Sequence, residues 1–175
     1  MTQHAITQDS AGGPLRLGIF GGTFDPPHLG HLISAQEVAA QLHLDRVLFI
    51  PAGEPPHKQE HVITPAHHRR AMVARAIAGD ARFALSLIEL ERSGPSYTVD
   101  TLAQLRAEYG AGAQLILILG GDMVYDIGGW HNPAGIVAQV ARLAAVQRPG
   151  FAFDAEALAR LAAQVPGLDA VIVPV

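Results

Sequence analysis

The chain has 175 residues, 49% of them apolar and 16% charged, which is enough for one domain with a sizeable core. The formal net charge of −4 argues against non-specific binding to nucleic acid, and the lack of cysteine excludes disulfides and cysteine-based metal sites. No apolar run reaches the roughly 18 residues of a membrane span. The first residues also lack the features of a signal peptide. We therefore expect a cytoplasmic protein that binds neither membrane nor nucleic acid.

Short apolar runs bounded by glycine or proline alternate along the chain with stretches of helical spacing. Such short runs are typical of strands that are buried on both faces. We expect strands at residues 15–20, 46–50, 115–119, 142–146 and 170–173, with a weaker candidate at 82–87. Residues 1–14 are polar and end in Gly-Gly-Pro, and we expect them to form a flexible tail.

Helices are expected between these strands, the first of them beginning near Leu29. The other boundary signals are Thr64 as a cap with Pro65 at the first helical position, Ser96 or Thr98 as a cap, Gly110 as a stop, Asn132 followed by Pro133, and Asp154 as a cap. The alternation predicts an α/β fold: a doubly wound, mainly parallel sheet with helices on both faces. Ligands sit outside the carboxyl ends of such strands, so functional residues should directly follow strands.

A glycine-rich segment, GGTFDPPHLGH, follows the first predicted strand at residues 21–31. Gly21 and Gly22 let the backbone approach a ligand, and the free N–H groups of the helix that follows favour an anion. His28 and His31 are three residues apart and share one face of the first helical turn. Two imidazoles beside a helix N-terminus suit a phosphate chain, and a metal-binding pair is the alternative.

The second predicted strand leads into the segment IPAGEPPHK, residues 50–58. Lys58 is the only lysine of the chain, because the other eleven basic residues are arginines. An ammonium group is a compact and mobile point charge that follows phosphate charge as it moves. Lys58 either serves a phosphate in this way or is a surface residue left over by an arginine-biased composition.

The segment GPSYT at residues 94–98 precedes an expected helix. Ser96 or Thr98 would cap that helix, and its first N–H groups would also suit a carboxylate.

Gly120-Gly121-Asp122 directly follows the expected strand at residues 115–119. An acidic residue at the end of a strand commonly accepts a hydrogen bond from a ribose hydroxyl, and the alternative is that Asp122 caps a helix. Trp130, the only tryptophan, sits among glycines before His131. Its flat indole either stacks on a ligand ring or closes the core.

Taken in order, these segments resemble the nucleotidyltransferase superfamily with the T/H-x-G-H motif, in the form of bacterial nicotinate-mononucleotide adenylyltransferases. GGTFDPPHLGH resembles its first motif, IPAGEPPHK its P-P-H-K segment, GPSYTVDTL its S-Y-T element, and G-x-D followed by tryptophan its ribose and nicotinate site. The resemblance implies a Rossmann-like fold and adenylyl transfer from ATP to nicotinate mononucleotide in NAD biosynthesis, giving nicotinate adenine dinucleotide and pyrophosphate. The alternatives are another transferase of the superfamily, of the pantetheine-phosphate or cytidylyl type, and a non-catalytic nucleotide-binding relative.

The resemblance also implies roles for individual residues. The catalytic residues would be His28, His31 and Lys58. The ATP site would comprise Gly21, Gly22, Thr23, Phe24, His28, Gly30, His31, Gly120, Asp122 and Arg148. The mononucleotide site would comprise Phe24, His57, Lys58, Tyr97, Thr98, Asp122, Trp130 and His131. Mg²⁺ would arrive on the phosphates of ATP with no protein ligand, and a homo-oligomer is compatible with this family.

The family pattern continues past the last strand into an I-S-x-T-x-x-R segment that holds ATP phosphates, whereas this sequence ends at Val175. Either the protein lacks this segment or the sequence continues beyond Val175, and we expect the latter. Residues 15–175 would then form a single nucleotidyltransferase domain without its C-terminal segment. Arg69 and Arg148 also match segments of the family.

Overall fold

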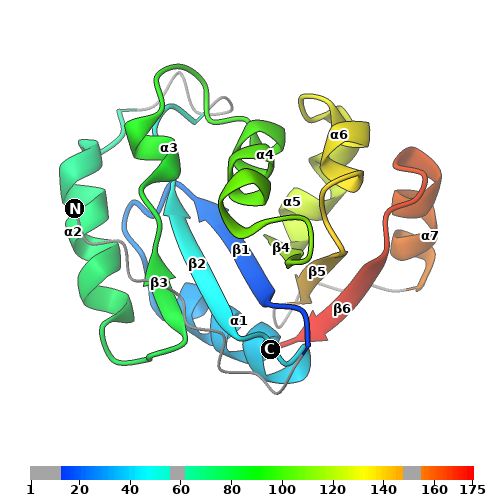
Figure 1. The fold of residues 1–175 in the computed structure, drawn as a ribbon, viewed down its shortest axis with the longest axis horizontal. Helices are drawn as coiled ribbons and strands as arrows, with labels where there is room; N and C mark the ends of the chain where they lie inside the picture. The colour runs from blue at the N-terminus through cyan, green and yellow to red at the C-terminus, as the bar shows by residue number, and fades with distance from the viewer. Residues whose placement is uncertain (1–12, 56–61, 148–154) are drawn as a thin grey trace.

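The structure, a computed structural model, describes residues 13–55, 62–147 and 155–175. Its parallel strands form one sheet in the order β3-β2-β1-β4-β5-β6 (Figure 1). The strands are β1 (Arg16–Gly22), β2 (Arg46–Pro51), β3 (Phe83–Leu85), β4 (Gln114–Gly120), β5 (Arg142–Gln147) and β6 (Ala170–Pro174). The helices are α1 (Leu29–Gln41), α2 (Ala66–Ile77), α3 (Ile88–Glu91), α4 (Thr98–Tyr109), α5 (Gly121–Asp126), the 3-10 helix η1 (Ile127–Gly129), α6 (Pro133–Val137) and α7 (Ala155–Gln164). The predicted α/β class and doubly wound parallel sheet are confirmed.

The central strands are buried on both faces. Alternate side chains of a strand point to opposite faces, so each strand contributes to two separate cores. In β4, Leu115, Leu117 and Leu119 belong to one core, while Ile116 and Ile118 belong to the other. This is why the strand reads as a continuous apolar run in the sequence.

Different helices cover the two faces of the sheet. The first core is closed by α4, α5, α6 and α7, through buried side chains such as Leu102 and Leu161. The second core is closed by α1 and α2, through side chains such as Val38 and Val73. In Figure 1, α4 lies in front of the sheet and α1 lies behind it. The two helices that follow β1 and β2 therefore pack on one face, and those that follow β3, β4 and β5 on the other.

β1 and β4 extend beyond their apolar runs. Gly21 and Gly22 still pair with Ile50 and Pro51 of β2, and Gly120 still pairs with a residue of β5. The sequence pattern predicts that each strand ends at its last apolar side chain. The hydrogen bonds between strands are made by backbone groups, however, and glycine has these groups too. These glycines therefore lie at the carboxyl edge of the sheet rather than in the loops.

Three predicted helix boundaries are confirmed, the first of them being the start of α1 at Leu29. Gly110 ends α4 with a φ of +81°, a backbone conformation that favours glycine. The Asn132 side chain accepts a hydrogen bond from the Gly135 N–H at the start of α6, with Pro133 in the first turn. The predicted cap at Asp154 lies outside the described residues.

Two other predicted caps are wrong. Thr64 does not cap α2, because Pro65 occupies the N-cap position and no side chain caps the helix. Neither Ser96 nor Thr98 caps α4, whose N-cap residue is Tyr97. The Ser96 hydroxyl instead accepts from backbone N–H groups of the loop after β2, so a tertiary contact has taken this group from its helix. The Thr64 backbone is bound by the Asp25 carboxylate and by Arg69 of α2.

The short helices α3 and α5 were not predicted, because a segment of one turn or so shows no apolar periodicity. The weak strand candidate at residues 82–87 is a real strand, but β3 covers only its centre. None of the helices in the described residues has the length and apolar character needed to span a membrane.

The strand order reverses beside β1. The chain runs outward from β1 to β2 and β3, then returns to form β4 on the other side of β1. The loop after β1 leads to α1 on one face, whereas β4 leads to α5 on the other face. The two connections diverge and leave a crevice between them, where such folds bind ligands.

We predict that Gly110→Ala lowers the free energy of unfolding by about 1–3 kcal/mol, because alanine is strained at a φ of +81°. Gly112→Ala is the matched control, since Gly112 has no positive φ and no atom within 4 Å of its would-be Cβ. This control should be neutral or stabilising by a few tenths of a kcal/mol. Urea unfolding of both variants measures the difference. Equal effects would contradict the strain argument.

Candidate active site

A pocket with a volume of about 460 Å³ opens at the carboxyl ends of β1, β2 and β4. It lies at the point where the strand order reverses, which is where the sequence placed the site. Of the predicted residues, the pocket brings together Gly21, Gly22, Thr23, His28, His31, Tyr97, Thr98, Gly120, Trp130 and His131. Motifs that are far apart in the sequence therefore share one cavity.

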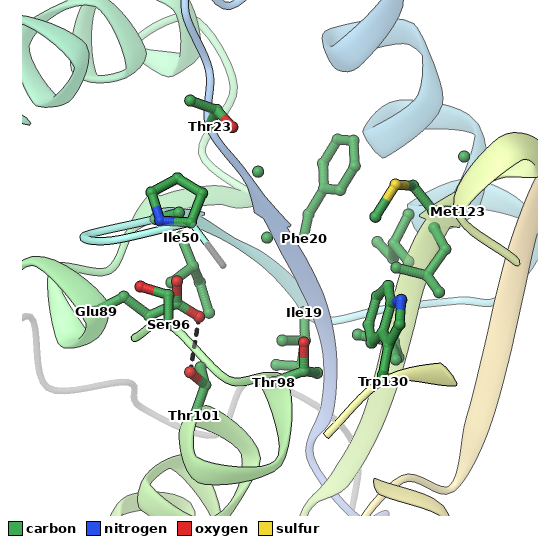
Figure 2. Close-up of a pocket in the computed structure, with 18 of the residues that line it drawn as sticks. Ile19, Phe20, Thr23, Ile50, Glu89, Ser96, Thr98, Thr101, Met123 and Trp130 are labelled. Atoms are coloured by element: carbon green, nitrogen blue, oxygen red, sulfur yellow. Dashed lines mark hydrogen bonds between the residues drawn. The ribbon is translucent and has the colours of Figure 1, made fainter. Parts of the chain in front are cut away.

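The pocket has two walls. Figure 2 shows Glu89, Ser96 and Thr101 on one side of β1, with Met123 and Trp130 on the other side. The first wall comes from α3 and the start of α4, and the second from α5 and the segment after η1.

The backbone of β1 is open to the pocket at its end. Gly21 is exposed and has no atom within 4 Å of the position where a side chain would begin. A ligand can therefore approach the strand backbone directly, as predicted for the glycine-rich segment. Gly22 serves a different purpose, because a Cβ there would lie 3.2 Å from the Phe24 ring.

His28 and His31 lie together at the N-terminus of α1. Their ring centroids are 3.8 Å apart, and both rings line the pocket. The His28 N–H donates a hydrogen bond to His31 Nδ1 over 3.2 Å, so His31 reaches back and caps its own helix. Because Nδ1 is an acceptor there, the proton of the neutral ring belongs on Nε2, which leaves Nε2–H as a donor.

Phe24 does not line the pocket with its side chain. The ring is only 2% exposed and packs between Phe20, Phe49 and His31, with its centroid 5.1 Å from the His31 ring. Phe24 also has a φ of +50°, which is unusual for a bulky residue. It therefore anchors the loop in the core and supports the His31 ring, and only its backbone remains for a ligand.

Gly30 has a local role in the helix start. A Cβ at this position would lie 3.0 Å from Cε1 and Nδ1 of His28. The glycine therefore makes room for the His28 ring. Gly30, which the resemblance assigns to the ATP site, is not among the described lining residues of the pocket.

A buried arginine ties the loop after β1 to the start of α2. Arg69 is 2% exposed and donates hydrogen bonds to the carbonyl oxygens of Thr64, over 2.8 Å, and Thr23, over 2.9 Å. The Thr64 N–H in turn donates to the Asp25 carboxylate over 2.8 Å. Burial lowers the pKa of Arg69, and the nearby charge of Asp25 opposes that change. This clamp fixes the backbone at Thr23, a residue of the pocket wall.

Aromatic residues form the other end of the pocket. The Tyr97 and His131 rings are stacked, with centroids 4.3 Å apart and an angle of 24° between the planes. Trp130 is half-buried, lines the pocket and also packs against the core. The two interpretations of this tryptophan, ligand stacking and core closure, are therefore compatible. None of the described lining residues is a lysine or an arginine.

Sequence reasoning missed the acidic residue of the first wall. Glu89 in α3 is 7% exposed and lines the pocket. Burial raises the pKa of the Glu89 carboxyl, while hydrogen bonds from Thr101 and Ser96 and the charge of Arg92 oppose this shift. Its signal in the sequence is weak, because a glutamate between Ile88 and Leu90 looks like an ordinary surface residue.

Several predicted site residues fall outside this description. His57, Lys58 and Arg148 are not among the described residues. Asp122 lies in the first turn of α5, directly after β4, and its side chain is not described. Within residues 13–55, 62–147 and 155–175, no three or more histidine or acidic side chains are grouped so that they could hold a metal.

A family model described as cytidylyltransferase-like matches residues 19–169, which is most of the chain. The chain therefore belongs to the cytidylyltransferase-like family, the class of protein that the fold and the glycine–histidine site define. Within this class it is one of the nicotinate-nucleotide adenylyltransferase group, as the following relatives indicate.

A Bacillus licheniformis protein named "Probable nicotinate-nucleotide adenylyltransferase" is 45% identical over 139 residues, covering 79% of this chain and 72% of the relative. A Thermomicrobium roseum protein of the same name is 49% identical over 143 residues, covering 82% of this chain and 66% of the relative. For a Geobacillus thermodenitrificans protein, again of that name, the share of the relative is 63%. The chain thus spans slightly less than two thirds of the length of some of these curated relatives.

Solved structures share the fold. A Plasmodium falciparum nicotinic acid mononucleotide adenylyltransferase complexed with NaAD superimposes with a TM-score of 0.72 at 18% identity, covering 92% of this chain and 75% of that one. The same enzyme complexed with APC gives a TM-score of 0.71. At this identity the likeness concerns the fold alone.

We predict that Arg69→Met lowers the free energy of unfolding by about 3 kcal/mol, because two buried carbonyl groups lose a charged donor. Methionine keeps most of the apolar stem, so the loss reports the guanidinium rather than the packing. Arg70→Met is the matched control, since Arg70 is the exposed neighbour on the same helix. Denaturant unfolding should leave this control within about 0.5 kcal/mol of the parent. A similar small effect of Arg69→Met would refute the clamp.

Proposed function

We propose that this protein transfers the adenylyl group of ATP to nicotinate mononucleotide, giving nicotinate adenine dinucleotide and pyrophosphate. The observation that carries the proposal is one pocket that joins a glycine–histidine end, suited to an anion, with an aromatic end. The names of the 43–49% identical relatives support the same activity. In the reaction, the phosphate oxygen of the mononucleotide attacks the α-phosphorus of ATP. The bond from that phosphorus to the bridging oxygen breaks, and pyrophosphate leaves.

The phosphate end would be formed by the start of α1. The open backbone at Gly21 and the two imidazoles line this end of the pocket, and the dipole of α1 would favour an anion beside them. His31 Nε2–H would donate to a phosphate oxygen, since Nδ1 is occupied by the His28 N–H. Transfer of this kind is served mainly by positioning and charge stabilisation, so no covalent nucleophile is required.

Mg²⁺ bound to ATP would neutralise the charge that develops on the phosphates. Lys58 and Arg148 are proposed as further phosphate-binding residues and Asp122 as a nucleotide-binding residue, all from the family resemblance.

The aromatic end would receive the nicotinate ring between Trp130 and the Tyr97–His131 stack. With no described cation in the lining, the nicotinate carboxylate would be bound by backbone N–H groups at the start of α4, near Thr98. The nicotinate carboxylate only accepts hydrogen bonds and so suits these backbone N–H groups. The amide of nicotinamide has N–H donors of its own, which would face the backbone donors unfavourably. We therefore propose that the acid is preferred over the amide, with His57 as a further contact.

We also place the reaction in the cytoplasm, where ATP and a mononucleotide are both available, and a homo-oligomer remains compatible with the proposal. The deciding experiment offers ATP and Mg²⁺ to the full-length protein together with nicotinate mononucleotide, nicotinamide mononucleotide or pantetheine phosphate. Pyrophosphate release is measured. Release with nicotinate mononucleotide supports the proposal, and release only with pantetheine phosphate would replace it. No release with any acceptor would favour a nucleotide-binding relative without this activity.

We predict that His31→Ala and His31→Gln both lower kcat by roughly 10²–10³, because a donor to the reacting phosphates is lost. Glutamine at the third helical position can still accept from the cap N–H, so His31→Gln should be more stable than His31→Ala. Steady-state kinetics and thermal unfolding separate the two roles. His68→Ala, an exposed histidine on α2, is the control. Unchanged turnover in folded His31→Gln would remove the imidazole from the mechanism.

We predict that nicotinate mononucleotide changes the fluorescence of Trp130, which is the only tryptophan. Trp130→Ala should weaken the acid and the amide alike, by about fivefold, since stacking contributes about 1 kcal/mol beyond burial. Trp130→Phe keeps an aromatic ring and should restore most of the affinity. An unresponsive fluorescence signal, or an amide used as well as the acid, would show that this end of the pocket is assigned wrongly.

A further inference from the structure

Glu89 is a charged side chain buried in the wall of the pocket, and the roles derived above do not use it. Its carboxylate accepts a hydrogen bond from Thr101 Oγ1 over 2.7 Å, drawn in Figure 2. The Ser96 hydroxyl is near the same carboxyl and opposes the rise that burial causes in the pKa of Glu89. Thr101 Oγ1 itself accepts from Arg92 Nη2 over 3.1 Å. The Thr101 hydroxyl thus links the Glu89 carboxylate to the Arg92 guanidinium.

The Ser96 hydroxyl connects this carboxylate to the loop that follows β2. Its oxygen accepts from the Gly53 N–H over 3.0 Å and from the Glu54 N–H over 3.3 Å. A hydroxyl has a single proton, so giving it to Glu89 leaves its lone pairs to face these two backbone donors. A carboxylate on the proton side of this hydroxyl would fix the orientation in which Ser96 binds the loop.

The backbone reinforces the same contact. The Ser96 N–H donates to the Glu54 carbonyl over 2.9 Å, and Glu54 forms a parallel bridge with Pro95. A Cβ on Gly53 would lie 2.3 Å from the Glu89 carbonyl oxygen, so only glycine allows this close approach. The loop after β2 and helix α3 are therefore so close at Gly53 that a side-chain atom does not fit between them.

We propose that Glu89 is a positioning residue that acts through Ser96, holding the loop after β2 against the start of α4 and thereby shaping the mononucleotide end of the pocket. The inference rests on the proposed function, because it assigns the Tyr97–Thr98 wall to the nicotinate ring. Glu89 itself touches no reacting atom in this scheme. It orients Ser96 and Thr101, the residues on either side of Tyr97 and Thr98 in the sequence.

The test is a double-mutant cycle on the full-length protein with Glu89→Ala, Ser96→Ala and the double variant. Each single change should raise KM for nicotinate mononucleotide about tenfold, as expected for a lost charge-assisted hydrogen bond, and leave KM for ATP within about twofold. The double variant should be no worse than the worse single variant, because both changes break the same link. Effects that multiply would overturn the proposal.

Two further variants separate positioning from folding. Glu89→Gln should recover most of the affinity: its amide oxygen accepts from Ser96 and its amide nitrogen donates to Thr101, whose hydroxyl then turns to the Tyr97 carbonyl at 3.3 Å. Glu91→Ala, the exposed glutamate of the same helix, is the control and should match the parent. If the Glu89 variants raised KM for both substrates equally, and in proportion to their loss of thermal stability, Glu89 would have a structural role only and the proposal would be overturned.

The outcomes also distinguish this inference from the proposed function. A parent enzyme that releases pyrophosphate, together with Glu89→Ala that keeps the parent KM for the mononucleotide, overturns the role of Glu89 alone. A parent protein that releases no pyrophosphate from ATP and nicotinate mononucleotide overturns the proposed function, and the role of Glu89 falls with it.

Discussion

The position of the pocket depends on one feature of the fold, which is that the chain leaves the ends of β1 and β4 in different directions. β1 and β4 are neighbours in the sheet, but the chain leaves them toward opposite faces. In the part of the chain that the structure describes, no helix crosses the gap between the two exits, and the backbone at Gly21 and Gly120 lines the pocket there. The imidazoles belong to the start of α1, which follows β1. The indole and Met123 come from the segments that follow β4.

Most of the fold followed from the sequence because buried parallel strands are apolar on both faces. Each expected strand is present, and the errors concern ends, where glycine continues a ladder that side-chain patterns do not reveal. Thr64 and Ser96 have the right chemistry for a helix start, but the Ser96 hydroxyl binds the loop after β2, and Asp25 and Arg69 hold the Thr64 backbone. Such contacts join segments that are distant in the sequence, so the residues around a helix start do not reveal them.

The site was predictable where a residue's chemistry is conspicuous, as with the paired histidines and the single tryptophan. The site was not predictable where a buried charged side chain supports it from within the protein. Arg69 and Glu89 are both almost fully buried, and each bonds to backbone or hydroxyl groups of segments that form the pocket. An isolated arginine or glutamate in a sequence is usually a solvated surface residue. Only the folded arrangement shows that these two charges replace water for groups that would otherwise be unsatisfied.

The cap of α1 places two demands on a single nitrogen. His31 Nδ1 must carry a lone pair to receive the His28 N–H, whereas a doubly protonated ring would attract phosphate more strongly. A second ring proton and the peptide N–H would therefore compete for the same nitrogen. The bond that this nitrogen accepts holds the ring against the first turn of α1, whose backbone dipoles point toward the same side. The helix start thus fixes the direction of the imidazole as well as its own end.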